Sequence, residues 1–563
     1  MVAIFRRLFM SDQSMSSLPM DPAPYLSTLP AEVLQLIIEH THPSAHWPLA
    51  QSCSRLYQNS ERVLNLHRDA YRRFRVTSDL VPMTGFNLLW SVFSHGAAHI
   101  DAWHVREFEI WGERDFTWRS DPEADSDADE APPDEGSESR TWPPPESDIE
   151  YFCEKLLKIP DFFPKTYKEP WGDHVRYGLE TGRDSITKSL MLVHLPRIRA
   201  IRCAKSGRER YPGIEMLYEY IYWCKAAGTW LPGLETLEKV SVAIPPDGGY
   251  TILSTCSDEF AALLCLPNLS EVYFAHMDGD FELSDLGVDL FTNSPQAPFD
   301  KTSPVRTIIL DNLEESLSEI LINFLAKLPS ALQNLTVRFD YHDESEARSR
   351  SATSLVDALS KHQCNSLQRV CFHAQNETDG PYFTQGLGPD LICAFDDLRV
   401  VTMDWLAVEM SLATSGEKLS REDLLGRLFG LFEFRLPNQM ETLVLDFFGG
   451  TGGVLMIGEL TGSNREKMGY VDEAVEAAIK SRRYGNLKAV MLKDIQARLH
   501  DIIGARWYFP KAVKAAEERG IYIDLKGDRP PPEVSISREF VPIPTRSCMV
   551  TGGLRTEDDD TFL

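Results

Sequence analysis

One pattern of apolar positions recurs along most of the chain. It consists of an apolar residue, two variable residues, a second apolar residue, one variable residue and a third apolar residue. The last two apolar positions are separated by a single residue, so they face the same side of an extended strand. The pattern therefore predicts a series of short strands, each with one buried face. Its copies span 105–110, 198–203, 269–274, 305–310, 332–337, 367–372, 398–403, 440–445 and 487–492, with a stretched copy at 231–244.

Helical patterns separate several of these copies. The segments 315–339, 354–372 and 471–492 each read as a helix, a turn and a strand. One such unit cannot bury its apolar face alone, so neighbouring units are expected to stack into an elongated array. The fold class we predict for the larger part of the chain is therefore α/β. The array is expected to start within 76–118 and to continue through 149–530 as a divergent, horseshoe-like solenoid.

Three short amphipathic helices are predicted before this array. The first begins with Pro30, whose missing N–H costs nothing in a first helical turn, and Glu32 lies near the positive end of the helix dipole. A second helix is predicted within 47–59, and a third starts at Ser60. Their apolar faces consist of Val33, Leu34, Ile37 and Ile38, then Leu49, Ala50, Cys53, Leu56 and Tyr57, then Val63, Leu64, His67, Tyr71 and Phe74.

A helical bundle of about 50 residues has only a marginal core of its own. We therefore expect part of its apolar surface to contact another protein or the following domain. In particular, we expect the chain's own fold to leave Leu34, Ile37 and Ile38 partly uncovered.

The ordered residues of the first two helices resemble an F-box. The motif reads Leu29-Pro30-x-Glu32-Val33-Leu34-x-x-Ile37-Ile38, followed by Leu49-Ala50-x-x-Cys53-x-x-Leu56-Tyr57. The resemblance assigns residues 23–75 to an F-box and implies docking to the Skp-type adaptor of a cullin–RING ubiquitin ligase. The adaptor-binding residues that it implies are Leu29, Pro30, Glu32, Leu34, Ile37, Ile38, Leu49, Cys53, Leu56 and Tyr57.

The strand–helix array resembles the substrate-binding half of many fungal F-box proteins, in which leucine-rich repeats bind a protein target. From 198 onward its copies begin roughly 27 to 47 residues apart, whereas regular leucine-rich repeats are about 20–29 residues long. The resemblance therefore implies a leucine-rich-repeat-like solenoid of divergent units. Side chains between the buried strand positions would face its concave surface, and the alternative is that they form an ordinary solvated sheet face. The candidates for target binding are Glu271, Tyr273, Thr336, Arg338, Arg369, His373, Thr402 and Asp404.

The charge of the chain narrows the choice of partner. Lys and Arg total 57 and Asp and Glu total 84, which gives a formal net charge of −27. Nucleic acids and anionic membranes attract positive surfaces, so neither is an expected partner. Nine acidic residues between 121 and 138 precede a proline run. This composition predicts a disordered acidic insertion over 119–148, and disordered tails are predicted at 1–22 and 531–563.

The cysteines and histidines give no metal-binding pattern. Ten cysteines occur without a CxxC pair, which indicates a reducing compartment. His40, His42 and His46 crowd one predicted turn, but no Cys or carboxylate joins them at ligand spacing, so a solvated loop without metal is expected. The N-terminal apolar run is too short for a secretory signal, and no run approaches the length of a membrane span. We therefore expect a cytoplasmic or nuclear protein.

One segment is similar to an enzyme motif. The strand and glycine-rich turn LVLDFFGGTGG, 443–453, resemble the first motif of class I S-adenosylmethionine-dependent methyltransferases. Asp472 lies about where that family places its ribose-binding carboxylate. However, the chain's own repeat explains both the strand at 440–445 and the helix from Val471. GxSxG, HExxH and GxxxxGK[ST] motifs are absent from the sequence, so we expect no catalytic residue and no cofactor.

Together with these patterns, the F-box resemblance implies a non-catalytic subunit that recruits a protein target to a Skp–cullin–F-box ubiquitin ligase. The helices would bind the adaptor, and the array would hold the target close to the transfer machinery at a high effective concentration. Two alternatives remain. The first is a repeat scaffold whose N-terminal helices are only a structural cap, and the second is the methyltransferase.

Overall fold

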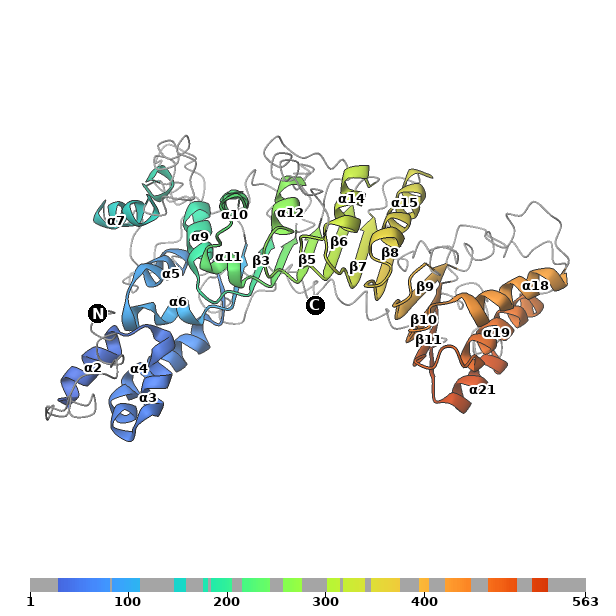
Figure 1. Cartoon of the computed structure of the whole chain (residues 1–563), viewed down its shortest axis with the longest axis horizontal. Coiled ribbons are helices and arrows are strands. Elements are labelled where there is room, and N and C mark those ends of the chain that lie inside the picture. The colour runs from blue at the N-terminus through green and yellow to red at the C-terminus, as the bar shows by residue number, and fades with distance from the viewer. Residues whose placement is uncertain are drawn as a thin grey trace, which may run out of the picture.

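The computed structural model describes residues 29–80, 84–111, 146–157, 176–180, 184–204, 215–243, 257–275, 301–313, 317–339, 346–374, 394–404, 421–446, 464–493 and 509–524. Within these residues, a group of N-terminal helices leads into one long sheet that carries helices along its length (Figure 1).

Twelve parallel strands form the sheet, and their order in space is their order in the chain. Each strand pairs with the next one along the sequence, which is compatible with a solenoid-like α/β fold. The strands are β1 Val76–Ser78, β2 Glu107–Ile110, β3 Ala200–Ala204, β4 Lys239–Ala243, β5 Glu271–Ala275, β6 Thr307–Leu313, β7 Asn334–Phe339, β8 Arg369–Ala374, β9 Val400–Asp404, β10 Thr442–Asp446, β11 Ala489–Lys493 and β12 Tyr522–Asp524.

The predicted apolar pattern accounts for ten of these strands, because its copies coincide with β2 to β11. In the copy at 332–337, the side chains of Leu332, Leu335 and Val337 are all fully buried. Leu335 and Val337 alternate along β7 toward the helices, as one buried face of a strand requires. The sequence pattern did not predict β1 and β12, which have three residues each and are too short for it.

The same backbone hydrogen bonds recur where one unit follows the next. The carbonyl of Gln333 accepts bonds from the N–H groups of Gln368 and Arg369, at 2.8 and 2.9 Å. The carbonyl of Gln368 likewise accepts from Arg399 and Val400, at 2.7 and 3.2 Å. These bonds satisfy the backbone where the chain enters each strand and fix the register of successive units. Equivalent acceptors are Arg75, Arg106, Arg199, Glu238, Ser270, Arg306, Arg399 and Glu441.

Helices connect the strands and cover one side of the sheet. Figure 1 shows α9, α10, α12, α14 and α15 along the side of β3 to β8, and α18, α19 and α21 beside β9 to β11. Their bounds are α5 Thr84–Phe93, η2 Gly96–His99, α6 Ile100–His104, α7 Glu146–Leu157, α9 Asp184–His194, α10 Glu215–Ala227, α11 Pro232–Thr236, α12 Ser257–Leu263, α14 Glu319–Lys327, α15 Glu346–His362, α18 Arg421–Gly430, η4 Leu431–Arg435, α19 Asn464–Lys480 and α21 Pro510–Arg519.

Local sequence signals begin and end these helices. Ser318 precedes α14, and its hydroxyl accepts a bond from the N–H of Leu321 at 3.3 Å. This side chain satisfies one of the donors that a helix leaves free at its first turn. At the other end of the array, α21 stops at Gly520, whose φ of 68° lies in the left-handed region that glycine adopts without strain.

The N-terminal helices are α2 (Ala31–His40), α3 (Pro43–Ser52) and α4 (Ser54–Phe74). The predicted second helix was wrong in extent, because Cys53 has extended backbone and separates α3 from α4. The predicted start of the third helix at Ser60 was also wrong. The Ser60 hydroxyl donates to the carbonyl of Leu56 at 2.7 Å and so bonds back along the interior of α4 instead of capping a helix.

Most of the segments predicted to be disordered lie outside the described residues, namely 1–22, 531–563 and the part of the acidic insertion up to 145. Residues 146–148 were also assigned to that insertion, but they form the first turn of α7. Glu146 and Asp148 suit that turn because a helix N-terminus favours negative charge. In the described part of the chain, every helix is too short or too polar to cross a membrane.

Candidate functional site

The inner face of α2 belongs to the chain's own core. Leu34 and Ile38 are 0% and 1% exposed, and they cluster with Leu56, Val63 and Ala70 of α4. Ile100 of α6 completes this cluster. The small N-terminal core is therefore shared with the start of the strand–helix array.

This burial corrects part of the predicted adaptor-binding set. Leu34, Ile38 and Leu56 were expected on an accessible contact surface, but their side chains are enclosed by intramolecular neighbours. The physical reason is that α2 uses these residues to pack on α4. Of the three α2 residues expected to stay partly uncovered, only Ile37 does so.

The outer face of α2 is apolar as well. Pro30, Val33, Leu36 and Ile37 follow one another at helical spacing, and they continue the apolar face of α2 from beside Leu34 round to Leu36, which lies nearly opposite Leu34 and Ile38. Leu36 is 56% exposed and Val33 is 39% exposed, Pro30 is exposed, and Ile37 is half-buried. The apolar surface of α2 is therefore wider than the part that the chain's own core covers. The outer face of α2, defined here as these four residues, is therefore a candidate contact surface.

Large exposed apolar side chains concentrate in the N-terminal helices. Of nine such residues in the described part of the chain, six lie between Val33 and Tyr71. The six are Val33, Leu36, Trp47, Tyr57, Leu66 and Tyr71, and the other three are Tyr177, Ile320 and Tyr522. The N-terminal helices therefore carry most of the exposed large apolar side chains among the described residues.

The remaining residues of the predicted adaptor-binding set are at least partly accessible. Tyr57 is 50% exposed, Glu32 is exposed, and Leu29, Leu49 and Cys53 are half-buried. Leu29 is held in place because Arg55 donates a 2.7 Å hydrogen bond to its carbonyl. Sequence reasoning missed Leu36 because it assigned the apolar residues of this segment to a single face.

Three histidines connect the N-terminal helices to the array. His46 Nε2 bonds the carbonyl of Thr41 at 3.1 Å, so this nitrogen is the donor. His46 Nδ1 must then accept, at 2.8 Å, from His67 Nε2, and His67 Nδ1 accepts from His104 Nε2 at 2.7 Å. We refer to His46, His67 and His104 as the histidine relay. It links α3, α4 and α6, so the expectation that His46 lies in a solvated loop was wrong.

The histidine relay is neutral at pH 7. Burial is the main cause that lowers the pKa of His67 and of His104 to about 4, and burial also lowers the pKa of His46. Arg106 and Arg197 act in the same direction on His104. Protonated His46 or His67 could not accept the bond that its neighbour donates, so the relay requires a single proton on each of these two rings.

The eight predicted target-binding residues divide into three groups. Glu271 and Arg369 occupy the first position of β5 and β8 and are half-buried. Tyr273 and Thr336, two residues further along their strands, were expected to be accessible but are buried. In register, Tyr273 lies between Ser241 and Ile309, which are buried too, so this row of the sheet is covered on both faces. Arg338, His373, Thr402 and Asp404 lie in β7, β8 and β9, and their side chains lie outside the described part of the structure.

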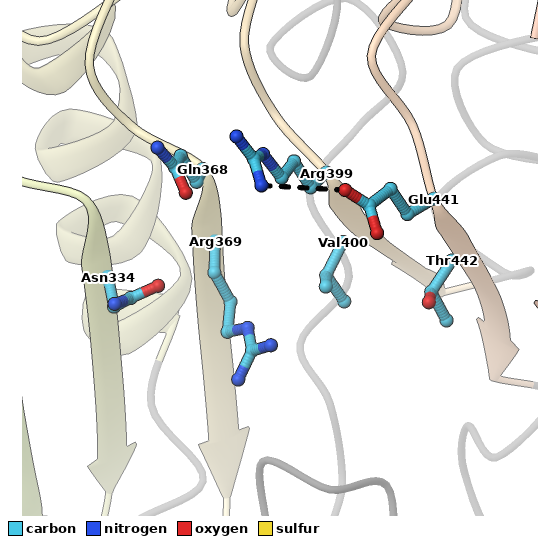
Figure 2. Close-up of a pocket in the computed structure, with 7 residues that line it drawn as sticks. All are labelled: Asn334, Gln368, Arg369, Arg399, Val400, Glu441 and Thr442. Carbon is cyan, nitrogen blue, oxygen red and sulfur yellow. Dashed lines mark hydrogen bonds and ion pairs between the residues drawn. The ribbon is translucent and has the colours of Figure 1, made fainter. Parts of the chain in front are cut away.

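A small pocket opens where β8 meets β9 (Figure 2). It encloses about 210 Å³ and lies at the end where the strands begin. Among the eight residues predicted to bind a target, only Arg369 lines this pocket. The pocket is lined by Asn334, Gln368, Arg369, Arg399, Val400, Glu441 and Thr442.

Charged groups dominate this pocket. Arg399 lies 3.5 Å from one carboxylate oxygen of Glu441, and Lys488 lies 2.5 Å from the other. The hydrogen bond from Lys488 is the main cause that lowers the pKa of Glu441, so its carboxylate is ionised at neutral pH. The lining residues therefore carry two guanidinium groups and one carboxylate, a net charge of 2 − 1 = +1.

The residue that resembled a ribose-binding carboxylate has a structural partner. Asp472 is buried on α19, and its two oxygens accept from the N–H groups of Lys511 and Ala512 at 3.0 and 2.7 Å. It thereby caps the first turn of α21. The glycine-rich segment that follows Asp446 lies outside the described residues.

Within the described ranges, no group of three or more His, Cys, Asp or Glu side chains is arranged to hold a metal ion. No protein-family model matches the sequence, and no curated protein matches it either.

Proposed function

We propose that this protein is a substrate-recruiting subunit of a Skp–cullin–F-box type ubiquitin ligase. In this proposal residues 23–75 are the F-box and bind the Skp-type adaptor, and through it a cullin. The leucine-rich-repeat-like array then holds a protein target, and no residue of the chain performs the transfer chemistry. The proposal rests on the F-box resemblance of the sequence and on the accessible surface of the same helices.

The observation that carries the proposal is the second apolar face of α2. Leu34 and Ile38 already anchor the inner face, so Pro30, Val33, Leu36 and Ile37 are not needed for the chain's own core. Burying a Leu or Val side chain is worth about 1.5–3 kcal/mol, which remains available to a partner when the chain leaves it in water. An apolar docking surface also suits an acidic chain, because it does not depend on charge attraction.

Co-purification with a Skp-type adaptor tests the proposal. Leu36→Asp should remove the adaptor from the purified complex, because it places a charge on an exposed apolar residue of the outer face. The matched control is Ile320→Asp on α14, since Ile320 is a similarly exposed apolar residue, at 44%, outside the N-terminal helices. Absence of the adaptor from the folded wild-type protein would refute the proposal.

A second candidate function is a repeat scaffold in which the N-terminal helices only cap the array. Ile100 favours it, because this residue of α6 lies in the same apolar cluster as Leu34 and Ile38. The cap would protect that cluster from water, as terminal units of repeat arrays do. Under this alternative, deletion of residues 1–75 causes aggregation, while Leu36→Asp changes no partner of the protein.

A further inference from the structure

The junction between β8 and β9 differs from the other junctions of the sheet. Neighbouring pairs have five or six registered residues, as in β7–β8 and β9–β10. Between β8 and β9, only Arg369 and Val400 are in register. The two strands start together, held by the Gln368 carbonyl, and then separate. The pocket forms at this separation, and Figure 2 shows Arg369 pointing toward it from β8.

Among the described residues, Arg369 has no acidic neighbour in register, whereas Lys239 in the same row does. In the same row, Lys239 of β4 lies 2.5 Å from Glu271 of β5. Arg202 of β3 similarly lies 3.4 Å from Glu107 of β2. The neighbours of Arg369 in register are Asn334 and Val400, which carry no charge.

Arg399 lines the same pocket, and its guanidinium lies on the side opposite that of Arg369. Among the side chains drawn in Figure 2, the only marked interaction joins Arg399 to Glu441, at 3.5 Å. A guanidinium has five N–H donors in a fork that matches the two oxygens of a carboxylate. The amide of Gln368 lies beside Arg399, whereas the amide nitrogen of Asn334 donates to the hydroxyl of Thr307 at 3.0 Å.

The size and polarity of the pocket select the ligand. Sites for drug-sized molecules are mostly apolar and enclose about 300–1,000 Å³, whereas this pocket encloses about 210 Å³ and Val400 is its one apolar lining residue. It therefore suits one charged side chain of a polypeptide. The net charge of +1 matches a singly charged group, and Glu441 repels a second negative charge.

We propose that Arg369 binds the carboxylate of an Asp or Glu side chain presented by an acidic peptide of the target. Arg399, on the opposite side of the pocket, adds positive charge that attracts the same carboxylate. The inference rests on the proposed function only in identifying the peptide as part of a target. The binding itself needs neither adaptor nor ubiquitin.

Fluorescence anisotropy with the full-length protein alone tests this assignment. The probe is a labelled Gly-Ser peptide that carries four glutamates, and the reference peptide carries glutamines at the same positions. The glutamate peptide should bind, and Arg369→Ala should weaken binding at least about tenfold, the loss typical of one charge-assisted hydrogen bond. Arg369→Lys keeps the positive charge but loses the two parallel N–H donors of the guanidinium. Its affinity for the glutamate peptide should therefore lie between those of the wild type and Arg369→Ala.

The matched control is Lys361→Ala, which removes one exposed cation from α15, away from the pocket, and should bind as wild type. Equal affinity for the glutamate and glutamine peptides, or full affinity in Arg369→Ala, would overturn the proposal. A phosphoserine peptide that binds more tightly than the glutamate peptide, or competition by inorganic phosphate alone, would overturn the choice of a carboxylate.

The ligase assignment and the carboxylate pocket can be refuted separately. Leu36→Asp should bind the glutamate peptide as wild type does, while Arg369→Ala should retain the adaptor. Adaptor binding without peptide binding refutes only the carboxylate pocket, and peptide binding without adaptor binding refutes only the ligase assignment.

Discussion

The N-terminal helices and the strand–helix array bury their apolar residues in different ways. In the array, apolar strand positions such as Leu335 and Val337 face the helices, and each unit covers the next. The row at the start of the strands is largely polar, with ion pairs such as Lys239–Glu271. In the N-terminal helices, by contrast, α2 has apolar residues on its outer face as well as on its inner face. A stacked array can complete its own core, whereas a short bundle leaves surface for a second protein.

The largest effect that this comparison predicts separates the two faces of α2. Leu34→Asp should destabilise the N-terminal helices by more than about 4 kcal/mol, because it places an unpaired charge in an apolar core. Leu36→Asp should change stability by about 0.5 kcal/mol or less, because Leu36 is in water already. Hydrogen exchange of α2 to α4 measures both. Equal destabilisation by the two variants would show that the faces are not distinct.

The next largest effect on stability is expected at Gly96, where the start of the array lies against the end of α2. Gly96 has φ of 62°, and a Cβ there would lie 1.9 Å from the backbone oxygen of Glu39 at the end of α2. Gly228 has φ of 67° but has no atom within 4 Å of the corresponding position. Both Gly→Ala changes should cost about 1–2 kcal/mol for the left-handed backbone. Gly96→Ala should lower the free energy of unfolding by more than Gly228→Ala does, because the new Cβ also forces the backbone of α2 to move.

Urea unfolding of the two glycine variants measures this difference. Gly228→Ala serves as the control for backbone strain alone. If Gly96→Ala is no less stable than Gly228→Ala, the close contact between Gly96 and α2 does not exist in solution.

A smaller effect should come from pH. The pKa of His67 and of His104 falls from 6.5 to about 4 on folding, so the unfolded chain binds more protons between these values. The histidine relay therefore stabilises α3, α4 and α6 fully above pH 6.5, and this stabilisation is lost as the pH falls toward 4. Hydrogen exchange of α4 should accelerate over this window, after correction for the intrinsic rate. His67→Gln should reduce the pH dependence.

The readout must be local, because His194 on α9 titrates in the same window. Burial lowers the pKa of His194 to about 4 as well, but this residue is outside the relay. A pH dependence of α4 that is unchanged in His67→Gln would contradict the role of the relay.

The sequence predicted the array well because one physical constraint repeats along it. Each strand must bury its alternate residues, so the same apolar spacing recurs and reveals β2 to β11. The predictions failed where a local interruption decides the outcome. The extended backbone of Cys53 divides two helices that the apolar spacing alone joins, and Ser60 bonds along α4 instead of capping it.

The candidate sites were predicted less completely, because they depend on how elements pack. Apolar spacing identifies the residues of α2 but not which face meets α4, so Leu34 was expected to be accessible and Leu36 was overlooked. Arg369 was named from its strand position. Arg399 and Gln368 were not, because they precede their strands and join the pocket only through the separation of β8 and β9.

The central claim is that the outer face of α2 binds a second protein, and the affinity of a purified Skp-type adaptor tests it most directly. The account predicts that Val33→Asp combined with Leu36→Asp weakens binding by at least about 100-fold, since each apolar side chain contributes about tenfold or more. Ile320→Asp should bind as wild type does. If the double variant binds the adaptor with unchanged affinity while it remains folded, the account is contradicted.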